Sequence, residues 1–200
     1  MRADQDQSRE SVRILGIACM TAAVVTGFLS GAWELKDPIL TSGEVFAAAP
    51  ALQRWAYGIL QLLKSAGFMA GLYGFYAIAT RRGPVLRAIM VLAAIGAAFF
   101  AAVWLVMAFT GRHTLLYVLG GLWYQWIAPL ALGIAALRVR RVVAWKGVWL
   151  IAVGVLNAVI FPPLGPGMAQ IVQGALWLPV GWFVYQASLG MEAQASPSSA

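Results

Sequence analysis

The sequence predicts an all-α integral membrane protein, a polytopic bundle of about six transmembrane helices. Its 200 residues are 62% hydrophobic and only 10% charged, and the mean hydropathy is +0.79. Soluble domains carry about 25% charged residues and fewer than ~50% apolar ones, and a soluble fold of this size could not bury so much apolar surface. Lipid is therefore the expected solvent, and we expect a multi-pass protein of the cell (plasma or inner) membrane.

Six apolar segments are each long enough, at about 20 residues or more, to cross a ~30 Å hydrocarbon layer. They cover residues 12–33, 55–79, 85–110, 115–137, 142–161 and 168–189. Pro129 lies inside the fourth segment and should kink it, while Pro162, Pro163 and Pro166 predict a tight turn between the last two. Residues 1–11 and 190–200 are expected to be cytoplasmic tails, the second of them disordered.

The basic residues predict the orientation of the bundle. Ten of them would lie on one side, and only Lys36, Arg54 and Arg112 would lie on the other. The positive-inside rule then places both termini in the cytoplasm, which an even number of spans also requires. An alternative is that the first span is a cleaved signal peptide, with Ser30-Gly31-Ala32 as its small-residue cleavage site.

The polar residues inside these segments define the candidate ligand site. Lys64 lies about ten residues from each end of the second segment, where a charge costs at least about 2.5 kcal/mol and usually has a partner and a role. Tyr57 and Gln61 share its helix face at i, i+4, i+7 spacing. The predicted ligand-binding residues, which gather in the outer half of the bundle as an outward-facing polar cavity, are Tyr57, Gln61, Lys64, Tyr124, Gln125, Asn157, Gln170, Gln173 and Trp177.

The carboxylates outside the two tails all lie in the first outer loop, residues 34–50. They are Glu34, Asp37 and Glu44. Loops of this length in tight bundles often act as lids. Glu34 directly follows the first segment, so we expect it to reach toward Lys64 or the glutamines. A solvated interfacial loop is the plainer interpretation.

Aromatic residues offer a wall for such a cavity. Trp104, Trp126 and Trp177 lie near the middle of their segments rather than at the interfaces. Together with Phe99, Phe100 and Tyr124 they could line a pocket for a flat or apolar ligand or stabilise a cation, unless they serve only core packing.

Several functions are disfavoured by what the sequence lacks. The single Cys19 and the single His113 provide neither a disulfide nor a thiolate or two-histidine metal site. No P-loop, nucleophile triad or HExxH motif is present, so we expect no metal and no cofactor. The net charge of +7 reads as a topology signal and a contact for anionic lipids, not as a nucleic-acid surface.

Small residues predict close helix packing. Gly27 and Gly31 form one GxxxG pair and Gly67 and Gly71 another, suited to contacts within the chain, in a homo-oligomer or with a membrane-complex partner. Ala18 and Ala22 form an AxxxA pair. With the chain length and six spans, this pair resembles the substrate-binding subunits of energy-coupling-factor vitamin transporters and their docking motif.

A second resemblance concerns the acidic loop. The triplet Ala32-Trp33-Glu34 resembles the acidic motif of integral-membrane terpene cyclases. That resemblance implies an acid-catalysed reaction on an isoprenoid, with a second essential acid in a late helix. The last two predicted spans contain no acid.

These observations predict a non-enzymatic protein that binds a small or amphipathic, anionic ligand and transports it or serves a transport assembly. Lys64 would supply the counter-charge, the amides would orient the ligand, and the 34–50 loop would cover it. Two alternatives stay open. One is a membrane-embedded enzyme acting on a lipid or isoprenoid, with Glu34 or Asp37 as the catalytic acid. The other is a structural subunit of a larger membrane complex.

Overall fold

The structure is a computed structural model that describes residues 2–40, 42–79, 83–139 and 142–195, and these residues contain helices but no strand. A first rod consists of α1 (Arg2–Ala22), the π-helix η1 (Ala23–Leu29) and α2 (Ser30–Lys36). The short α3 (Gly43–Ala48) leads into α4 (Ala51–Ala79) and α5 (Pro84–Thr110). A second composite helix joins α6 (Tyr117–Gly121), the π-helix η2 (Leu122–Ile127) and α7 (Ala128–Val139), and α8 covers Ala144–Ala195.

Three of the described helices are long and apolar enough to cross a membrane: Gln7–Lys36, Pro84–Thr110 and Tyr117–Val139. The shorter Ala144–Val159 is also apolar. Large apolar side chains face outward, with Phe109 76% and Val85 72% exposed, whereas Lys64 is only 2% exposed. This distribution is the reverse of a soluble fold and indicates a membrane protein.

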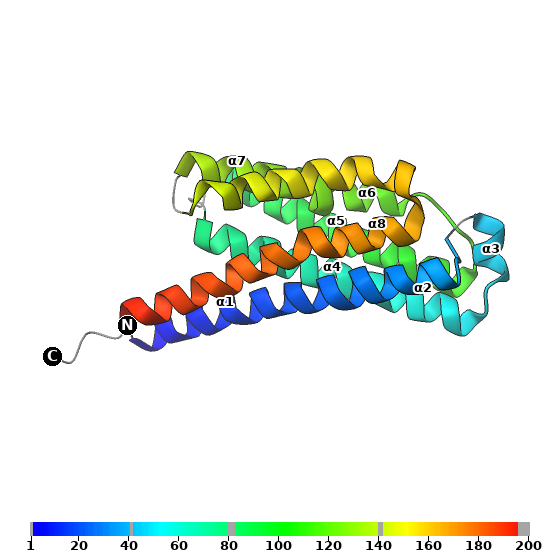
Figure 1. The fold of residues 1–200 in the computed structure, drawn as a ribbon, viewed down its shortest axis with the longest axis horizontal. Coiled ribbons are helices and arrows are strands. Elements are labelled where there is room, and N and C mark those ends of the chain that lie inside the picture. The colour runs from blue at the N-terminus through cyan, green and yellow to red at the C-terminus, as the bar shows by residue number, and fades with distance from the viewer. Residues whose placement is uncertain (1, 41, 80–82, 140–141, 196–200) are drawn as a thin grey trace.

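The last helical element contains a reversal at Gly165, where φ is 68° and ψ is 166°. Glycine adopts this positive φ without steric cost. The first arm (residues 144–164) returns antiparallel to the second arm (residues 166–195), since Trp149 Nε1 donates to the Leu176 carbonyl at 2.9 Å and the Trp145 ring lies 4.7 Å from Phe183. The predicted turn between the fifth and sixth segments is therefore present, and Figure 1 shows the two arms as a hairpin.

A seam of glycines holds the second arm against the first rod, and the two run side by side in Figure 1. A Cβ on Gly27 would lie 2.4 Å from the Gly174 Cα, and a Cβ on Gly174 would lie 2.7 Å from the Ala23 carbonyl. Gly31 meets Gly167 in the same way. The first GxxxG pair therefore packs within the chain, where close backbone approach replaces the hydrophobic driving force that lipid removes.

The second GxxxG pair packs against the AxxxA face. A Cβ on Gly67 would lie 2.0 Å from the Ala22 Cβ and 2.9 Å from the Ala18 carbonyl, and one on Gly71 would meet Cys19 Sγ at 2.5 Å. Cys19 is fully buried there. Ala22 is thus engaged inside the bundle, so this face does not offer a free docking surface of the kind the resemblance implied.

The fourth predicted span is disturbed where Pro129 was expected to kink it. Proline has no N–H and its ring clashes with the carbonyl four residues earlier, here that of Gln125. The helix takes the wider π form over Leu122–Ile127, immediately before the proline. Asn157 Nδ2 lies 3.4 Å from the Gln125 carbonyl and donates to it. The proline thus frees a backbone acceptor that a neighbouring helix satisfies.

The ends of the bundle differ from expectation. The first helix already begins at Arg2, so it includes most of residues 1–11. The last helix ends at Ala195, so it includes the first part of the 190–200 tail that we predicted to be disordered. Residues 196–200 lie outside the described part, as do Arg81, Arg82, Arg140 and Arg141 of the predicted cytoplasmic turns, and the Pro162 and Pro163 side chains are likewise not described.

Candidate functional site

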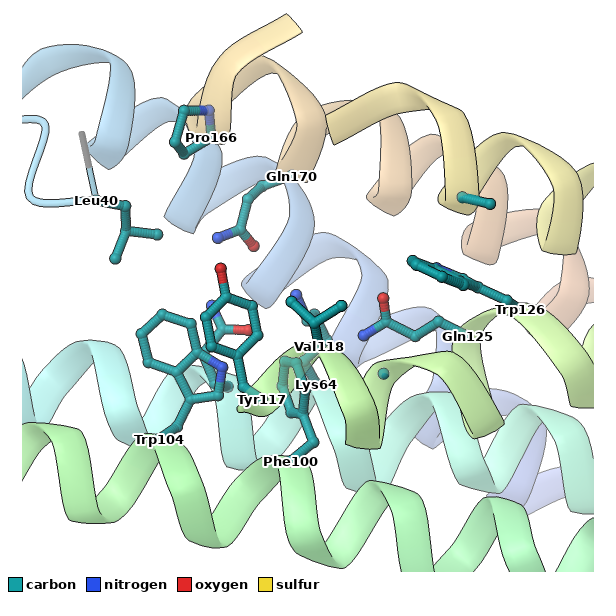
Figure 2. A pocket seen from close by; sticks show the side chains of 13 residues that line it. Leu40, Lys64, Phe100, Trp104, Tyr117, Val118, Gln125, Trp126, Pro166 and Gln170 are labelled. Atoms are coloured by element: carbon teal, nitrogen blue, oxygen red, sulfur yellow. The ribbon is translucent and has the colours of Figure 1, made fainter. Parts of the chain in front are cut away.

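A cavity of about 270 Å³ lies inside the bundle, between α4, α5, the α6–η2 segment and both arms of α8 (Figure 2). One end of it is polar and the remaining wall is aromatic or aliphatic. Its lining residues are Leu40, Gln61, Lys64, Phe100, Trp104, Tyr117, Val118, Gly121, Gln125, Trp126, Ala158, Pro166 and Gln170. The volume is close to the lower end of ~300–1,000 Å³ that is typical of small-molecule sites.

Lys64 lies at the polar end on the inward face of α4. Its Nζ donates to Gln173 Oε1 at 3.2 Å and lies 5.5 Å from the centroid of the Phe100 ring. No described carboxylate forms an ion pair with it. An ammonium has three donors, and desolvating it without an anion is costly. The site therefore holds a lysine amine whose hydrogen-bonding capacity is largely unused.

A chain of side-chain hydrogen bonds continues from this lysine. Gln173 Nε2 donates to Gln125 Oε1 at 3.0 Å, and Gln125 Nε2 donates to the Tyr124 hydroxyl at 2.5 Å. Ser65 Oγ lies 3.5 Å from that hydroxyl and donates to the Gln61 carbonyl at 2.9 Å. Each amide oxygen in this chain accepts and each amide nitrogen donates, so the chain fixes the orientation of the Gln125 amide at the cavity wall.

A second set of bonds orients Gln170. Its Nε2 donates to the Tyr57 hydroxyl, and its Oε1 accepts from Ser30 Oγ at 3.3 Å. Ser30 Oγ also donates to the Thr26 carbonyl in η1. The first rod, α4 and the second arm of α8 thus meet at a single glutamine.

Two groups at the cavity are buried without a hydrogen-bond partner among the described residues. Neither Nε2 nor Oε1 of Gln61 has a partner, and Trp104 Nε1 has none. Both side chains line the cavity, and Figure 2 shows the Trp104 indole beside Tyr117. An unsatisfied buried polar atom costs about 1–3 kcal/mol, which a ligand with hydrogen-bond acceptors would relieve.

The loop of residues 34–50 covers one end of the cavity. Leu40 contributes to its lining, and Phe46 of α3 is buried with its ring 6.4 Å from Trp104 and 5.9 Å from His113. Arg54 fixes the loop to the end of α5, since it donates to the Ala47 carbonyl at 3.2 Å and to the Ala108 carbonyl at 3.4 Å. The loop thus packs on the bundle through a few buried side chains such as Ile39 and Phe46, while most of its other described residues are exposed.

Glu34 does not take the role expected of it. The carboxylate is buried, but Oε1 accepts from the Leu40 backbone N–H at 2.8 Å and Oε2 has no partner among the described residues. It pairs with neither Lys64 nor a glutamine. A local backbone donor outcompetes a distant lysine because the bond closes within the loop itself. Asp37 is exposed and accepts from Gln53 at 2.6 Å.

The structure brings the nine predicted ligand residues close together, with different roles. Gln61, Lys64, Gln125 and Gln170 line the cavity. Tyr57, Tyr124, Asn157 and Gln173 lie behind this wall and hydrogen-bond to it. Trp177 is not part of the wall, because it stacks on Phe68 with ring centroids 4.3 Å apart. Ligand binding by these residues stays a prediction.

Of the apolar wall, sequence reasoning named Phe100, Trp104 and Trp126, which line the cavity, and missed the remaining residues. Tyr117, Val118, Gly121 and Ala158 carry no signal that distinguishes them from lipid-facing residues. Leu40 and Pro166 come from connections whose path depends on tertiary packing. Phe99, which we grouped with Phe100, is 42% exposed on the outside of the bundle.

His113 borders the same aromatic group, with its ring 6.2 Å from Tyr117. Partial burial among these rings lowers the pKa of His113 below its ordinary value of 6.5, because the apolar surroundings disfavour the cation. Among the described residues, no group of three His, Cys, Asp or Glu side chains is placed to hold a metal ion.

Comparisons with protein-family models, with curated proteins and with solved structures found no match to this chain.

Proposed function

We propose that this chain is a six-span membrane protein that binds a small or amphipathic anion in the cavity at Lys64 and transports it or delivers it to a transport assembly. The observation that carries the proposal is the buried ammonium, whose one hydrogen-bond acceptor is the neutral amide of Gln173. A charge without a counter-ion in a membrane bundle marks a functional site, and an anionic ligand would supply the missing charge.

The spans beyond the three long apolar helices are part of this proposal. In addition to those three we assign α4 and the two arms of α8 as transmembrane. Mean hydropathy is lowered in α4 by Gln61 and Lys64, which face the bundle interior rather than lipid. The described basic residues support cytoplasmic termini, since Arg9, Arg13, Arg87, Arg138 and Lys146 lie near the opposite end from Glu34, Asp37 and Glu44.

The test is native mass spectrometry of the purified protein, with lipid and metabolite identification. We expect the wild type to retain a specific anionic molecule that Lys64→Met loses, because methionine keeps the length of the side chain without its charge. Lys36→Met, at an exposed lysine, is the matched control and should retain the molecule. The same generic lipid profile in all three proteins would reject the proposal and favour the structural-subunit interpretation.

One observation favours the enzyme alternative. Glu34 is buried with a free oxygen, as a catalytic acid would be. It does not line the cavity, however, whereas Leu40, whose backbone N–H it binds, does. Glu34→Gln separates the two functions, with the exposed Asp37→Asn as control. Ligand retention unchanged in both variants supports binding alone, whereas conversion of a bound isoprenoid by wild type and not by Glu34→Gln would establish the enzyme.

A further inference from the structure

The cavity has a side opening as well as a polar end. The opening lies between Val118 of the α6–η2 segment and Ala158 of the first arm of α8, and Gly121, which is buried, lies deeper in the lining. Val118 is 38% exposed and Ala158 is exposed too, although both line the cavity. Residues that belong at once to the cavity and to the outer surface mark a passage between them.

This passage faces the apolar flank of the bundle. It lies within Tyr117–Val139, one of the helices apolar enough to cross a membrane. Neighbouring side chains on the same flank are apolar and exposed, with Leu119 at 58% and Val155 at 46%. None of the described rim residues is charged. A water-soluble anion would gain nothing along this route, whereas a membrane amphiphile could enter by it.

Hydrogen-bond donors gather at the inner end of the passage. Lys64 Nζ has one protein acceptor, while Gln61 Nε2 and Trp104 Nε1 have none among the described residues. All three side chains line the cavity. Several donors, one of them cationic, match the oxygens of a carboxylate or phosphate. The Gln61 amide oxygen can accept a hydrogen bond from a hydroxyl or a protonated head.

The volume argues for a chain that projects out of the cavity. About 270 Å³ is small for a drug-sized ligand. It accommodates a head and the first part of a chain, with Phe100 and Trp104 as an aromatic wall. The remainder must pass between Val118 and Ala158 into lipid.

We propose that the cavity binds the oxyanionic head of a single-chain membrane amphiphile, which enters sideways from the bilayer between the α6–η2 segment and the first arm of α8. Lys64, Gln61 and Trp104 hold the head, and the chain leaves over Val118, Gly121 and Ala158. This inference rests on the proposed function and names its ligand class. Fatty carboxylates and prenyl or alkyl monophosphates share the required chemistry.

Gly121 provides a plug for the passage that does not disturb the backbone. A Cβ there would meet only the ends of side chains, Phe100 at 3.8 Å and Gln125 at 3.9 Å, which are ordinary contacts. Its φ of −56° and ψ of −37° suit any residue. Gly121→Ala should therefore fit, and Gly121→Leu should fill the cavity from its side. Val118→Trp is a second plug, placed on the rim.

The experiment measures binding of defined probes to the purified full-length chain in detergent micelles. The probes are palmitate and farnesyl monophosphate, their neutral counterparts hexadecanol and farnesol, and the chainless anions acetate and inorganic phosphate. We expect the wild type to bind one amphiphilic anion at 1:1 and at least about tenfold more tightly than its alcohol, a difference of ~1.4 kcal/mol. Palmitate and farnesyl monophosphate distinguish a carboxylate from a phosphate head.

The variants test separately which residues contact the anionic head of the ligand and which contact its chain. Lys64→Met should abolish the preference for the anion over its alcohol. Gly121→Leu or Val118→Trp should weaken binding of the amphiphilic anion at least about tenfold. Leu119→Trp, which adds bulk at an exposed position outside the cavity lining, should bind as the wild type does. Size-exclusion profiles and thermal unfolding midpoints verify that each variant is folded, and the second plug replaces the first if Gly121→Leu fails to fold.

The outcomes separate this inference from the proposed function. If acetate or phosphate binds as tightly as its chain-bearing counterpart, and Lys64→Met abolishes that binding, the anion site stands and the side entry is rejected. Unchanged affinity of the amphiphile in both plugged variants also rejects the side entry. If no anion binds in a manner that depends on Lys64, both proposals fail.

Discussion

The contact between Lys64 and Gln173 is the most informative pair at the scale of single residues. The ammonium has this one amide oxygen as its protein acceptor, at 3.2 Å, and both side chains are almost completely buried. A buried charge that loses its acceptor costs more than a buried amide that loses its donor. The pair therefore predicts unequal effects of removing either partner.

We expect Gln173→Leu to destabilise the protein by about 1–3 kcal/mol, and more than Lys64→Met does. The double variant should lose less stability than the sum of the two single losses. Once Lys64 is replaced, Gln173→Leu no longer leaves a buried lysine without its acceptor. Thermal unfolding of the four proteins in micelles, followed by tryptophan fluorescence, measures this coupling. Additive losses would show that Gln173 does not support the charge.

Residue types explain which part of the site could be predicted from the sequence. Lysine and glutamine inside an apolar segment are conspicuous, so the polar end was predictable from Gln61, Lys64, Gln125 and Gln170. The partner of Lys64 was not predictable. We expected Glu34 to reach toward it, but Glu34 binds the Leu40 N–H instead, and that bond depends on the path of the loop. The aromatic wall residues Phe100, Trp104 and Trp126 were predictable from their positions near the middle of apolar segments. The aliphatic wall residues were not, because a valine facing a cavity and one facing lipid look alike in a sequence.

At the scale of helices, the seam between the first rod and the second arm of α8 depends on the absence of side chains. Gly174→Ala would place a Cβ 2.7 Å from the Ala23 carbonyl and 3.0 Å from the Gly27 Cα, both backbone atoms. Overpacking of this kind costs about 1–3 kcal/mol, so the unfolding midpoint should fall by several degrees, at ~2–4 °C per kcal/mol for a chain of this size.

Gly190→Ala is the matched control for that prediction, since a Cβ there meets nothing within 4 Å. Its unfolding midpoint should equal that of the wild type or exceed it slightly. If Gly174→Ala instead kept the midpoint but changed the oligomeric state in micelles, the glycines would serve contacts between copies.

The approximate positions of the long helices were predictable because each segment is long and apolar, but the extension of the first helix to Arg2 and of the last to Ala195 was not. The two π-helices were not, since they follow from packing. At η2, Pro129 prevents a regular helical bond to Gln125, and Asn157 from another helix takes that carbonyl. At η1, Thr26 Oγ1 donates to the Ala22 carbonyl at 2.6 Å beside the Gly27–Gly174 contact. Such wide turns often occur near functional sites, and both of these hold residues that orient the cavity glutamines.

The cover over the cavity should respond to pH through His113. Burial lowers the pKa of His113 in the folded state below its ordinary value of 6.5. The stabilisation of the closed loop by the packed neutral imidazole is therefore complete above about pH 6.5 and is lost as the pH falls toward the folded pKa. Protonation favours an opened loop in which the imidazolium reaches water. We expect hydrogen exchange of residues 42–50, corrected for intrinsic rates, to be faster at pH 5.5 than at pH 7.5.

His113→Phe retains a ring against Phe46 but cannot titrate, so its loop should exchange equally at both pH values. Because His113 is the single histidine of the chain, no other imidazole contributes in this range. An equal acceleration in wild type and variant would exclude His113 as its source and assign the effect to another titrating group.

At the scale of the whole molecule, orientation and span number are linked. Six spans require residues 1–11 and the C-terminal tail to share a side, with α3 on the other side. In a Cys19→Ala background, Ser8→Cys and Glu44→Cys each provide one exposed thiol. The native Cys19 is fully buried and should not react.

We expect a membrane-impermeant maleimide to label Glu44→Cys in intact cells, and Ser8→Cys only after permeabilisation. The reason is electrostatic, because Arg9 and Arg13 follow Ser8 whereas Glu34 and Asp37 lie near α3, and basic ends are retained in the cytoplasm. Labelling of both thiols in intact cells would place residues 8 and 44 on the same side of the membrane, so the first helix could not be a single span between them. Labelling of Ser8→Cys alone would show that the bundle has the inverted orientation. The loop that covers the cavity would then lie on the cytoplasmic side, and the ligand would be taken from that side of the membrane.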